Sequence, residues 1–454
     1  MANSRSDRSA SAKRAPMSRL SRLLLACTAA LLLTSCSDRP SIRSHASLNT
    51  EPEPALLTIW LWPGTGYEKL IERFDEDHPD IAMEIVRFDY QDLHNNLQTA
   101  FAAGYGAPDI TIIDHSYIER FKRFPAYFHN IAELTDEPLA DKFLDWKWKQ
   151  ATSDDGSFVY GMPTDIGPMV MAYRIFLYGT AGLPIERNAL AETTSDWDKF
   201  FEAGAMLTER TGKPMIDNIS TLYRVILGQA DVQYFDAATG EFIGDTNPAV
   251  RRAWDYAVRA KEEGLSAGLN QPTTEWARGL EQGHFATLLA PSWMLSYVTE
   301  NAPGANRQWT ITRIPEGSGN WGGSFMTIPK ESEHPEEAYA FIRWLSDEEQ
   351  QLEMFRTSNI FPAVSELYDR PEINNKRDGF FMGAPVGELL SDAAKRVRPV
   401  YEGPYQYLVN DHMDVALTNV EEGLLTGDQA WEQAMADIKQ VLADKQLPQR
   451  KGGR

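Results

Sequence analysis

Aromatic and hydrogen-bonding side chains stand where several buried apolar runs of this chain end. They are Trp62 after one run, Asp114 and His115 after another, and Trp293 after a third. Flat aromatic rings offer stacking surfaces, while carboxylates and imidazoles make strong hydrogen bonds. These residue types favour noncovalent binding of a ring-shaped ligand whose faces are apolar and whose edges are polar.

Five more residues complete the candidate binding set. Each is an aromatic ring or a carboxylate beside a proline, a glycine-rich stretch or an expected loop, and they are Tyr67, Asp165, Trp321, Tyr401 and Tyr405. Asp114 has an alternative role, because an aspartate just before a helix commonly caps its N-terminus. Tyr67 has one too, since an aromatic ring that opens a helix can pack in the core instead.

The sequence lacks the motifs of several enzyme classes. It has no His-Glu-x-x-His, no Gly-x-Ser-x-Gly and no phosphate-binding Gly-x-x-x-x-Gly-Lys, and its eight histidines show no ligand spacing. We therefore expect no catalytic residues, no metal and no cofactor. A secreted glycan hydrolase or lyase stays open as an alternative, because 65 acidic residues include chance pairs of carboxylates.

The chain is acidic, with a formal net charge of −21. Such a surface disfavours nucleic acid and other polyanions. Phosphate groups would want Arg or Lys in the binding loops, but the loops after Trp60, after Ile113 and before Trp293 have none. A neutral sugar fits better, and twelve tryptophans favour an oligosaccharide. A receptor for a non-sugar solute such as glycerol phosphate is the second alternative.

The stretch from Arg19 to Cys36 has the pattern of an export signal. Its apolar run, Leu23–Leu33, is shorter than the roughly 20 residues that a spanning helix needs. The run ends in Leu-Thr-Ser-Cys, which resembles a bacterial lipobox with Cys36 as the acylated residue. We expect a signal peptide over residues 1–35 and a lipid-anchored protein at the outer face of the cytoplasmic membrane or in the periplasm.

Residues 36–54 contain three prolines and several serines without apolar periodicity, which predicts a flexible tether. Cleavage after residue 35 would leave Cys36 as the single cysteine, so no disulfide is expected. Core burial alone must then stabilise the folded part, which is feasible for a chain of this length.

Beyond the tether, short apolar runs alternate with amphipathic stretches. Strands are expected at 56–61, 81–86 and 109–113, with helices over 67–78 and through Leu93 to Phe101 between them. This order predicts an α/β fold with right-handed parallel crossovers. Ligand sites in such sheets lie at the carboxyl ends of the strands, where Trp62 and Asp114 stand.

Several short motifs follow one another along the chain. They are Leu57-Thr58-Ile59-Trp60 with His78-Pro79, Ala103-Gly104 with Ala107-Pro108-Asp109-Ile110, Tyr160-Gly161-Met162-Pro163 with Met171-Ala172-Tyr173-Arg174, Gly283-His284-Phe285-Ala286 with Trp293, Gly322-Gly323 with Ile328-Pro329-Lys330, and a helix over Asp428–Leu442. Each motif alone is weak, but their order and spacing are specific. Together they resemble the motifs of the family 1 extracellular solute-binding proteins, the sugar receptors of bacterial ABC importers, which include maltose-binding protein.

This resemblance implies a two-lobed, periplasmic-binding-protein-like fold of the class II type, with a cleft between the lobes and a hinge of several crossings. The expected ranges are 55–161 and 323–370 for the first lobe, 163–319 and 377–443 for the second, and crossings near 161–165, 317–323 and 371–376. The glycine-rich composition of 317–323 suits a hinge, because glycine tolerates large backbone changes.

The resemblance also implies a function without chemistry. The protein would capture a neutral sugar by lobe closure and deliver it to two membrane permease subunits served by a cytoplasmic ATPase. It would act as a monomer, anchored to the membrane through Cys36, and would bind no nucleic acid.

Overall fold

The computed structural model describes residues 54–445. The expected signal peptide, the lipid attachment at Cys36 and nearly all of the tether lie outside the described residues. Among the residues described, none of the helices combines the length and the apolar character needed to cross a membrane.

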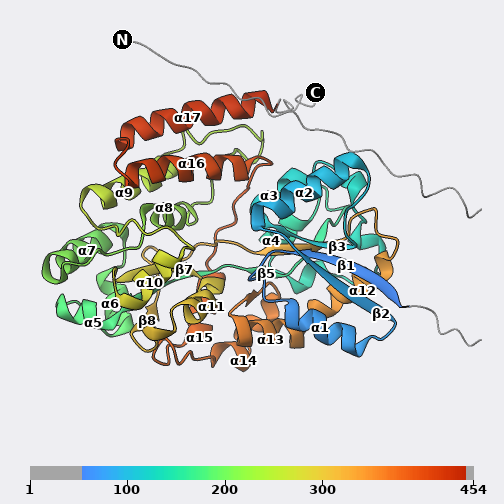
Figure 1. The fold of residues 1–454 in the computed structure, drawn as a ribbon, viewed down its shortest axis with the longest axis horizontal. Helices are drawn as coiled ribbons and strands as arrows, with labels where there is room; N and C mark the ends of the chain where they lie inside the picture. The colour runs from blue at the N-terminus through green and yellow to red at the C-terminus, as the bar shows by residue number, and fades with distance from the viewer. Residues whose placement is uncertain (1–53, 446–454) are drawn as a thin grey trace, which may run out of the picture. The chain divides into compact units, whose positions relative to one another are not determined.

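The first sheet has five strands in the order β2-β1-β3-β9-β4 (Figure 1). Its strands are β1 (Ala55–Leu61), β2 (Ile81–Arg87), β3 (Ile110–Asp114), β4 (Gly161–Pro163) and β9 (Ser324–Thr327). Strand β1 runs parallel to β2 and β3, whereas β9 is antiparallel to both β3 and β4. The three predicted strands and their parallel crossovers are therefore confirmed.

The second sheet has three strands, with β6 (Met169–Arg174) between β7 (Thr287–Pro291) and β8 (Trp309–Thr312). Both neighbours of β6 are antiparallel to it. Among the named strands of residues 54–445, parallel pairing is therefore confined to the first sheet, although Ile216 forms isolated parallel bridges with Ser266 and with Thr287 of β7.

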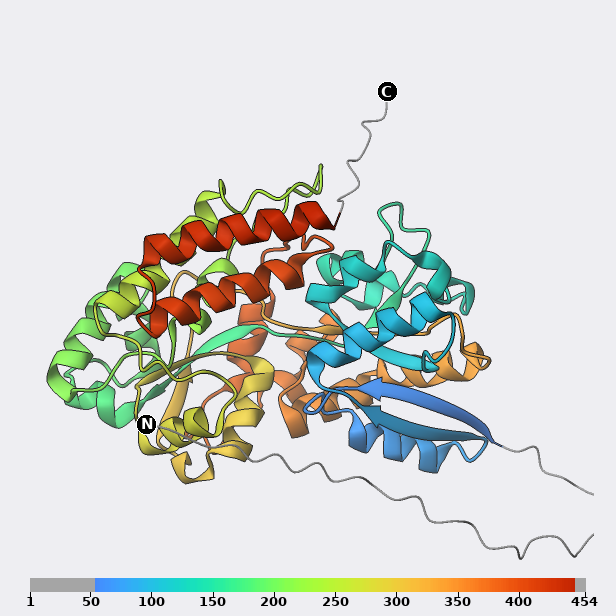
Figure 2. The same ribbon diagram turned by 45° about the horizontal axis from the view of Figure 1, so that its top comes forward.

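Helices surround both sheets (Figures 1 and 2). Around the first sheet lie α1 (Glu68–Asp77), α2 (Tyr90–Ala103), α3 (His115–Phe121), α4 (Asp145–Ala151), α12 (Pro335–Leu345) and α13 (Glu348–Ser358). The others are α5 (Ile175–Thr180), α6 (Arg187–Thr193), α7 (Trp197–Thr211), α8 (Ile219–Leu227), α9 (Pro248–Glu262), α10 (Thr274–Gln282), α11 (Ser292–Asn301), α14 (Pro371–Asn374), α15 (Val386–Ala394), α16 (Gln406–Glu421) and α17 (Gly427–Asp444).

The longer helices bury apolar residues at helical spacing. Helix α1 buries Leu70, Ile71 and Phe74 against the first sheet, as the 3.6-residue period requires. Helix α9 buries Trp254, which is 1% exposed and therefore belongs to the core. The predicted helix near the carboxyl end is present as α17, which begins with a capping box between Thr426 and Gln429.

Two large apolar clusters form most of the core. One joins the first sheet and its helices to residues of β7, α10 and α11. The other packs α7, α8 and α9 with α16 and α17. Helix α16 also packs against α3, and Figure 2 shows the two helices close together. Segments far apart in the chain therefore meet beside the first sheet.

The chain passes between the two sheets at two narrow places. One is β5 (Asp165–Ile166), between β4 and β6, which pairs with β10 (Phe361–Pro362). The other is the glycine-rich stretch before β9. Gly323 has φ +99°, and a Cβ there would lie 2.6 Å from the carbonyl oxygen of Asp165, so this position cannot hold a larger residue without a shift.

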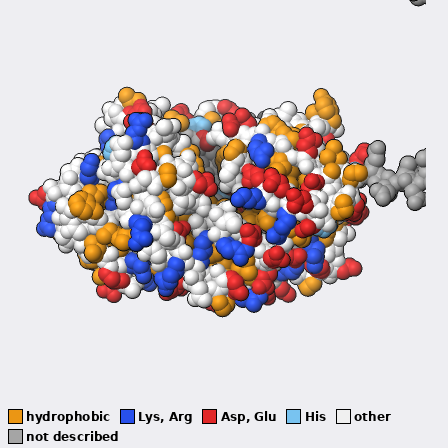
Figure 3. Space-filling model, turned by 60° about the horizontal axis from the view of Figure 1, so that its bottom comes forward, with side chains coloured by type: hydrophobic (Ala, Val, Ile, Leu, Met, Phe, Trp, Pro, Cys, Tyr) orange, Lys and Arg blue, Asp and Glu red, His pale blue; other side chains and the backbone are white. Residues whose placement is uncertain are grey.

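Acidic and basic side chains are both spread over the surface seen in Figure 3, with acidic ones gathered over the half that carries α1. This distribution agrees with the acidic net charge of the sequence. Like-charged ligands would be repelled by such a surface at long range.

Candidate functional site

The carboxyl ends of β1 and β2 bring aromatic rings together. Trp62 follows β1, and Tyr90 opens α2 three residues after β2; their ring centroids lie 5.2 Å apart in an edge-to-face arrangement. The imidazole of His94, one turn further along α2, lies 5.5 Å from the indole of Trp62. Because β1 and β2 are parallel neighbours, their loops emerge at one edge of the sheet.

Asp114 ends β3 and caps α3. Its carboxylate accepts hydrogen bonds from the backbone N–H of Ser116 at 2.9 Å and from the hydroxyl of Ser116 at 2.7 Å. Burial alone would raise the pKa of Asp114, but His115 and the bonds from Ser116 outweigh it and hold the pKa below its usual value. Asp114 therefore has the capping role that the sequence left open. The Ser116 hydroxyl also lies 3.1 Å from the Tyr90 hydroxyl, so it links Asp114 to Tyr90.

His115 joins three segments of the chain. Its Nδ1 lies 2.8 Å from a carboxylate oxygen of Glu402, and its Nε2 accepts a hydrogen bond from the backbone N–H of Gly322 at 3.1 Å. The backbone N–H of His115 donates to the carbonyl of Gly323 at 3.0 Å. In the neutral ring the Nδ1 proton is donated to Glu402; below the pKa of His115 the ring also takes a proton on Nε2, gives up the bond from Gly322 and forms a charge pair with Glu402. Burial lowers the pKa of His115, but the carboxylates of Glu402 and Asp114 outweigh it and raise the pKa overall.

Asp165 lies at the crossing between β4 and β6. Its carboxylate accepts hydrogen bonds from the N–H of Ser324 at 3.0 Å, from the hydroxyl of Thr164 at 2.9 Å and from that of Tyr67 at 3.3 Å. Burial raises the pKa of Asp165, although the ammonium of Lys147 opposes the shift. The carboxylate thereby fixes β9 to the crossing.

Lys147 of α4 is completely buried beside this crossing. Its Nζ lies 3.9 Å from the ring centroid of Phe325 and has no hydrogen-bond partner among the described residues. Burial lowers its pKa to about 8, against the opposing influence of Asp165, Asp114 and Glu402. These five charged or titratable residues, Asp114, His115, Lys147, Asp165 and Glu402, are called the junction cluster below.

Two tryptophans adjoin the junction cluster. The indole N–H of Trp293 donates to the carbonyl of Trp321 at 3.1 Å, and the two rings meet edge to face at 5.8 Å. Trp293 was expected directly after a buried apolar run, and that run is β7. Pro291 ends β7 and α11 begins at Ser292, because the strand leads directly into a helix, so Trp293 lies in the first helical turn.

Arg224 of α8 lies over the ring of Trp321, 5.3 Å from its centroid, and pairs with Asp414 of α16. The side chain of Arg224 is 37% exposed, and so is Tyr90. The protein nevertheless surrounds Tyr90 enough that burial raises the pKa of its hydroxyl well above the usual value.

We call Trp62, Tyr90, Arg224, Trp293, Trp321 and Asp414 the aromatic rim. The rim and the junction cluster are continuous, since Ser116 links Asp114 to Tyr90 and Gly322 links His115 to Trp321. Stacking faces and hydrogen-bonding groups thus adjoin one another. Such a set can hold a polar ring molecule but contains no arrangement for covalent catalysis among the described residues.

The predicted site residues fall into two groups. Trp62, Asp114, His115, Asp165, Trp293 and Trp321 belong to the rim or the junction cluster. The rings of the other three pack into apolar clusters: Tyr67 is 1% exposed, Tyr405 is 7% exposed and accepts a hydrogen bond from Arg123 at 2.6 Å, and Tyr401 is half-buried.

Five residues of the site were missed in the sequence. The signal for Tyr90 was present, because it follows β2 just as Trp62 follows β1. Glu402 stands between Tyr401, which was singled out, and a glycine. Lys147, Arg224 and Asp414 lie within helices, where nothing in the local sequence tells a site residue from a solvated charge.

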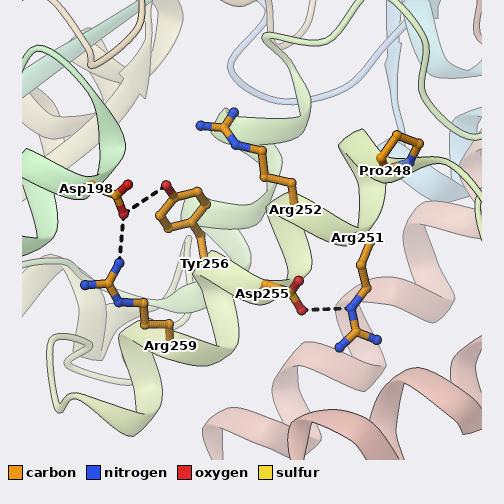
Figure 4. Close-up of a pocket in the computed structure, with 7 residues that line it drawn as sticks. All are labelled: Asp198, Pro248, Arg251, Arg252, Asp255, Tyr256 and Arg259. Atoms are coloured by element: carbon orange, nitrogen blue, oxygen red, sulfur yellow. Dashed lines mark hydrogen bonds and ion pairs between the residues drawn. The ribbon is translucent and has the colours of Figure 1, made fainter.

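A separate hollow of about 340 Å³ lies on the surface of α7 and α9 (Figure 4). Its three arginines are each paired: Arg251 with Asp255 at 2.8 Å, Arg252 with Glu316 at 2.6 Å and Arg259 with Asp198 at 3.0 Å. The hollow shares no residue with the rim or the junction cluster. Its charges are neutralised within the protein, so we assign no ligand to it.

Comparison with known proteins adds independent information. The sequence profile described as bacterial extracellular solute-binding protein matches residues 69–380. The arabinooligosaccharide-binding protein of Bacillus subtilis is 26% identical over 92% of this chain and 98% of its own length. The lactose-binding protein of Rhizobium radiobacter is 26% identical over 82% of this chain and 88% of its own.

Solved structures agree. The crystal structure of an extracellular solute-binding protein of family 1 matches with a TM-score of 0.77 and 30% identity, and it covers 85% of this chain and 99% of that one. The two-lobed fold predicted from the sequence is confirmed.

Proposed function

This chain belongs to the bacterial extracellular solute-binding protein family, and we propose that it is the receptor of an ABC importer for an uncharged oligosaccharide. Two relatives whose names specify an arabinooligosaccharide and lactose support a sugar as the ligand. The observation that carries the proposal is the pair Trp293 and Trp321 beside the Arg224–Asp414 ion pair. This arrangement puts aromatic faces next to hydrogen-bonding groups, as a sugar ring requires.

Capture would work by stabilising a closed form. The rim takes Trp62 and Tyr90 from the first sheet's loops, and Arg224 and Trp293 from helices beyond the crossings. A sugar that contacts both sets favours the arrangement in which they approach each other, and the permease would read that difference. The protein would release the sugar unaltered and have no catalytic activity.

The protein would be held at the outer face of the cytoplasmic membrane by a lipid on Cys36. Residues 36–54 would act as the tether. The protein would act as a monomer.

A thermal-shift screen over neutral mono- and oligosaccharides tests the proposal, because a ligand that binds the native form raises the melting temperature. We expect one group of related sugars to raise it, and chromatography of the sugar after incubation to show no change. A uniform lack of response, or conversion of the sugar to products, would reject the receptor function.

A further inference from the structure

The ion pair between Arg224 and Asp414 is the most polar part of the aromatic rim. The Nε of Arg224 lies 3.3 Å from one carboxylate oxygen, and an Nη contacts the other, so the contact is two-pronged. The two side chains are 37% and 32% exposed. The pair is therefore formed and still accessible to a ligand that rests on Trp321.

The surroundings of this pair are acidic. Asp411, one turn earlier on α16, has its pKa raised by burial and by Asp414. Around Arg224, the carboxylate of Asp414 outweighs the effect of burial and raises the pKa of the guanidinium. A second anion approaching Arg224 would meet a cation that is already neutralised and two carboxylates that repel it.

Hydroxyl groups meet no such obstacle. A guanidinium has five N–H donors, of which Asp414 uses two, and a carboxylate has spare lone pairs. Neighbouring hydroxyls of a sugar ring can accept hydrogen bonds from the guanidinium of Arg224 and donate to the carboxylate of Asp414 while the ring face lies on Trp321. An acidic sugar would have to displace Asp414 to gain the same cation.

We propose that the Arg224–Asp414 pair is the charge filter of the binding site, admitting uncharged sugar rings and excluding sugars that carry a carboxylate. This inference rests on the proposed function and adds the residues that set its selectivity. Asp414 acts by occupying Arg224, and Arg224 then serves as a donor to hydroxyls.

Matched sugars test the filter. In each pair every hydroxymethyl group of the neutral sugar is replaced by a carboxylate in the acidic one: 1,4-linked galactobiose with 1,4-linked digalacturonate, and the 1,4-linked disaccharides of glucose and of glucuronate. For the wild-type protein we expect calorimetry to show the neutral member binding at least about 100-fold more tightly, because Asp414 and Asp411 repel the carboxylate of the acidic member and Arg224 is already paired. In Asp414→Asn, which frees Arg224, we expect that preference to narrow by about tenfold or more.

Asp437→Asn is the matched control, because Asp437 is an exposed carboxylate on the neighbouring helix α17 and its removal changes the net charge equally. It should leave the preference unchanged. Equal binding of neutral and acidic members by the wild type, or the same preference in Asp414→Asn as in the control, would overturn the filter.

Sulfate gives a readout that needs no sugar. We expect added sulfate to raise the melting temperature of Asp414→Asn more than that of Asp437→Asn, because only the former has an unpaired guanidinium at the rim. Equal responses would overturn the assignment. If no sugar binds the wild type, but sulfate raises the melting temperature of Asp414→Asn more than that of Asp437→Asn, then Asp414 does neutralise Arg224 and only the proposed receptor function is rejected.

Discussion

The imidazole of His115 and the carboxylate of Glu402 lie 2.8 Å apart although 287 residues separate them in the chain. His115 begins α3 beside the first sheet, while Glu402 precedes α16, which packs on α8 and α9. Two further contacts join the same segments, a hydrogen bond from Arg123 to the Tyr405 hydroxyl and a stack of Tyr117 on Tyr407. The two parts of the molecule are thus held together by protein contacts as well as by any ligand.

The His115–Glu402 pair predicts a specific pH dependence. Since the folded-state pKa of His115 is raised, its charge pair contributes full stability below the unfolded pKa of about 6.5 and loses it as pH rises through the folded pKa. Urea unfolding at a series of pH values should show the stability difference between wild type and Glu402→Gln shrinking from acid to alkaline pH. A difference that is constant with pH would contradict this account.

Lys147 predicts the opposite trend above neutral pH. Burial lowers the folded-state pKa of Lys147 to about 8, whereas the unfolded-state pKa is about 10.4. The unfolded state therefore binds more protons than the folded state between these two pH values. The wild type should therefore gain stability relative to Lys147→Met between about pH 8 and 10.4, on the order of 2 to 3 kcal/mol. Lys149→Met, exposed on the same helix, should show no such trend.

Trp293→Ala should weaken binding of the sugar found in the screen by about tenfold or more, because an aromatic stack contributes about 0.5–1.5 kcal/mol beyond the burial that is lost as well. Isothermal titration calorimetry measures the change. Trp293→Phe keeps a ring but loses the hydrogen bond to Trp321, and it should retain most of the affinity. Unchanged affinity in the alanine variant would remove Trp293 from the site.

Gly323→Ala should destabilise the protein by about 1–3 kcal/mol beyond the cost of the same change at Gly317. Both residues have positive φ, but a Cβ at Gly317 meets nothing within 4 Å, whereas one at Gly323 would collide with the carbonyl of Asp165. Thermal unfolding of the two variants separates steric contact from backbone strain. Equal losses would show that the close approach at Gly323 has no energetic effect.

Cys36→Ser should move the protein from the membrane fraction to the soluble fraction of the cell envelope while sugar binding persists, because a lipid chain requires the thiol. Fractionation followed by immunoblotting measures the distribution. Retention of the variant in the membrane would reject the anchor.

Periodicity sufficed for β1, β2 and β3 of the first sheet, where each apolar run forms a strand and a residue after it reaches the site, but it did not predict β4 and β9. Trp62 and Asp114 could be predicted for this reason. The same rule applied to β2 would have found Tyr90. The motif order of the whole chain, rather than any local pattern, predicted the two-lobed fold, and it is the basis for expecting Asp165 and Trp321 near crossings.

Contacts between side chains that are far apart in the chain could not be predicted from the sequence. Lys147 looks like an ordinary helical lysine beside tryptophans, and only the packing of α4 beneath Phe325 makes it a buried cation. Arg224 and Asp414 are 190 residues apart, so no spacing rule connects them. Tyr405 is an aromatic residue beside a proline in the sequence, and its hydroxyl accepts a hydrogen bond from Arg123 because α16 packs on α3.

Strand β9 lies between β3 and β4 and bonds to both, although more than 150 residues separate it from either. A nascent chain therefore cannot complete its amino-terminal sheet until residue 327 has been synthesised. This delay would favour passage of the chain through a secretion channel in an unfolded form, because long-range strand pairing is slow. The same insertion makes β3 and β4 depend on a strand that comes much later in the chain, so a truncation after β8 would leave them as open edges exposed to aggregation.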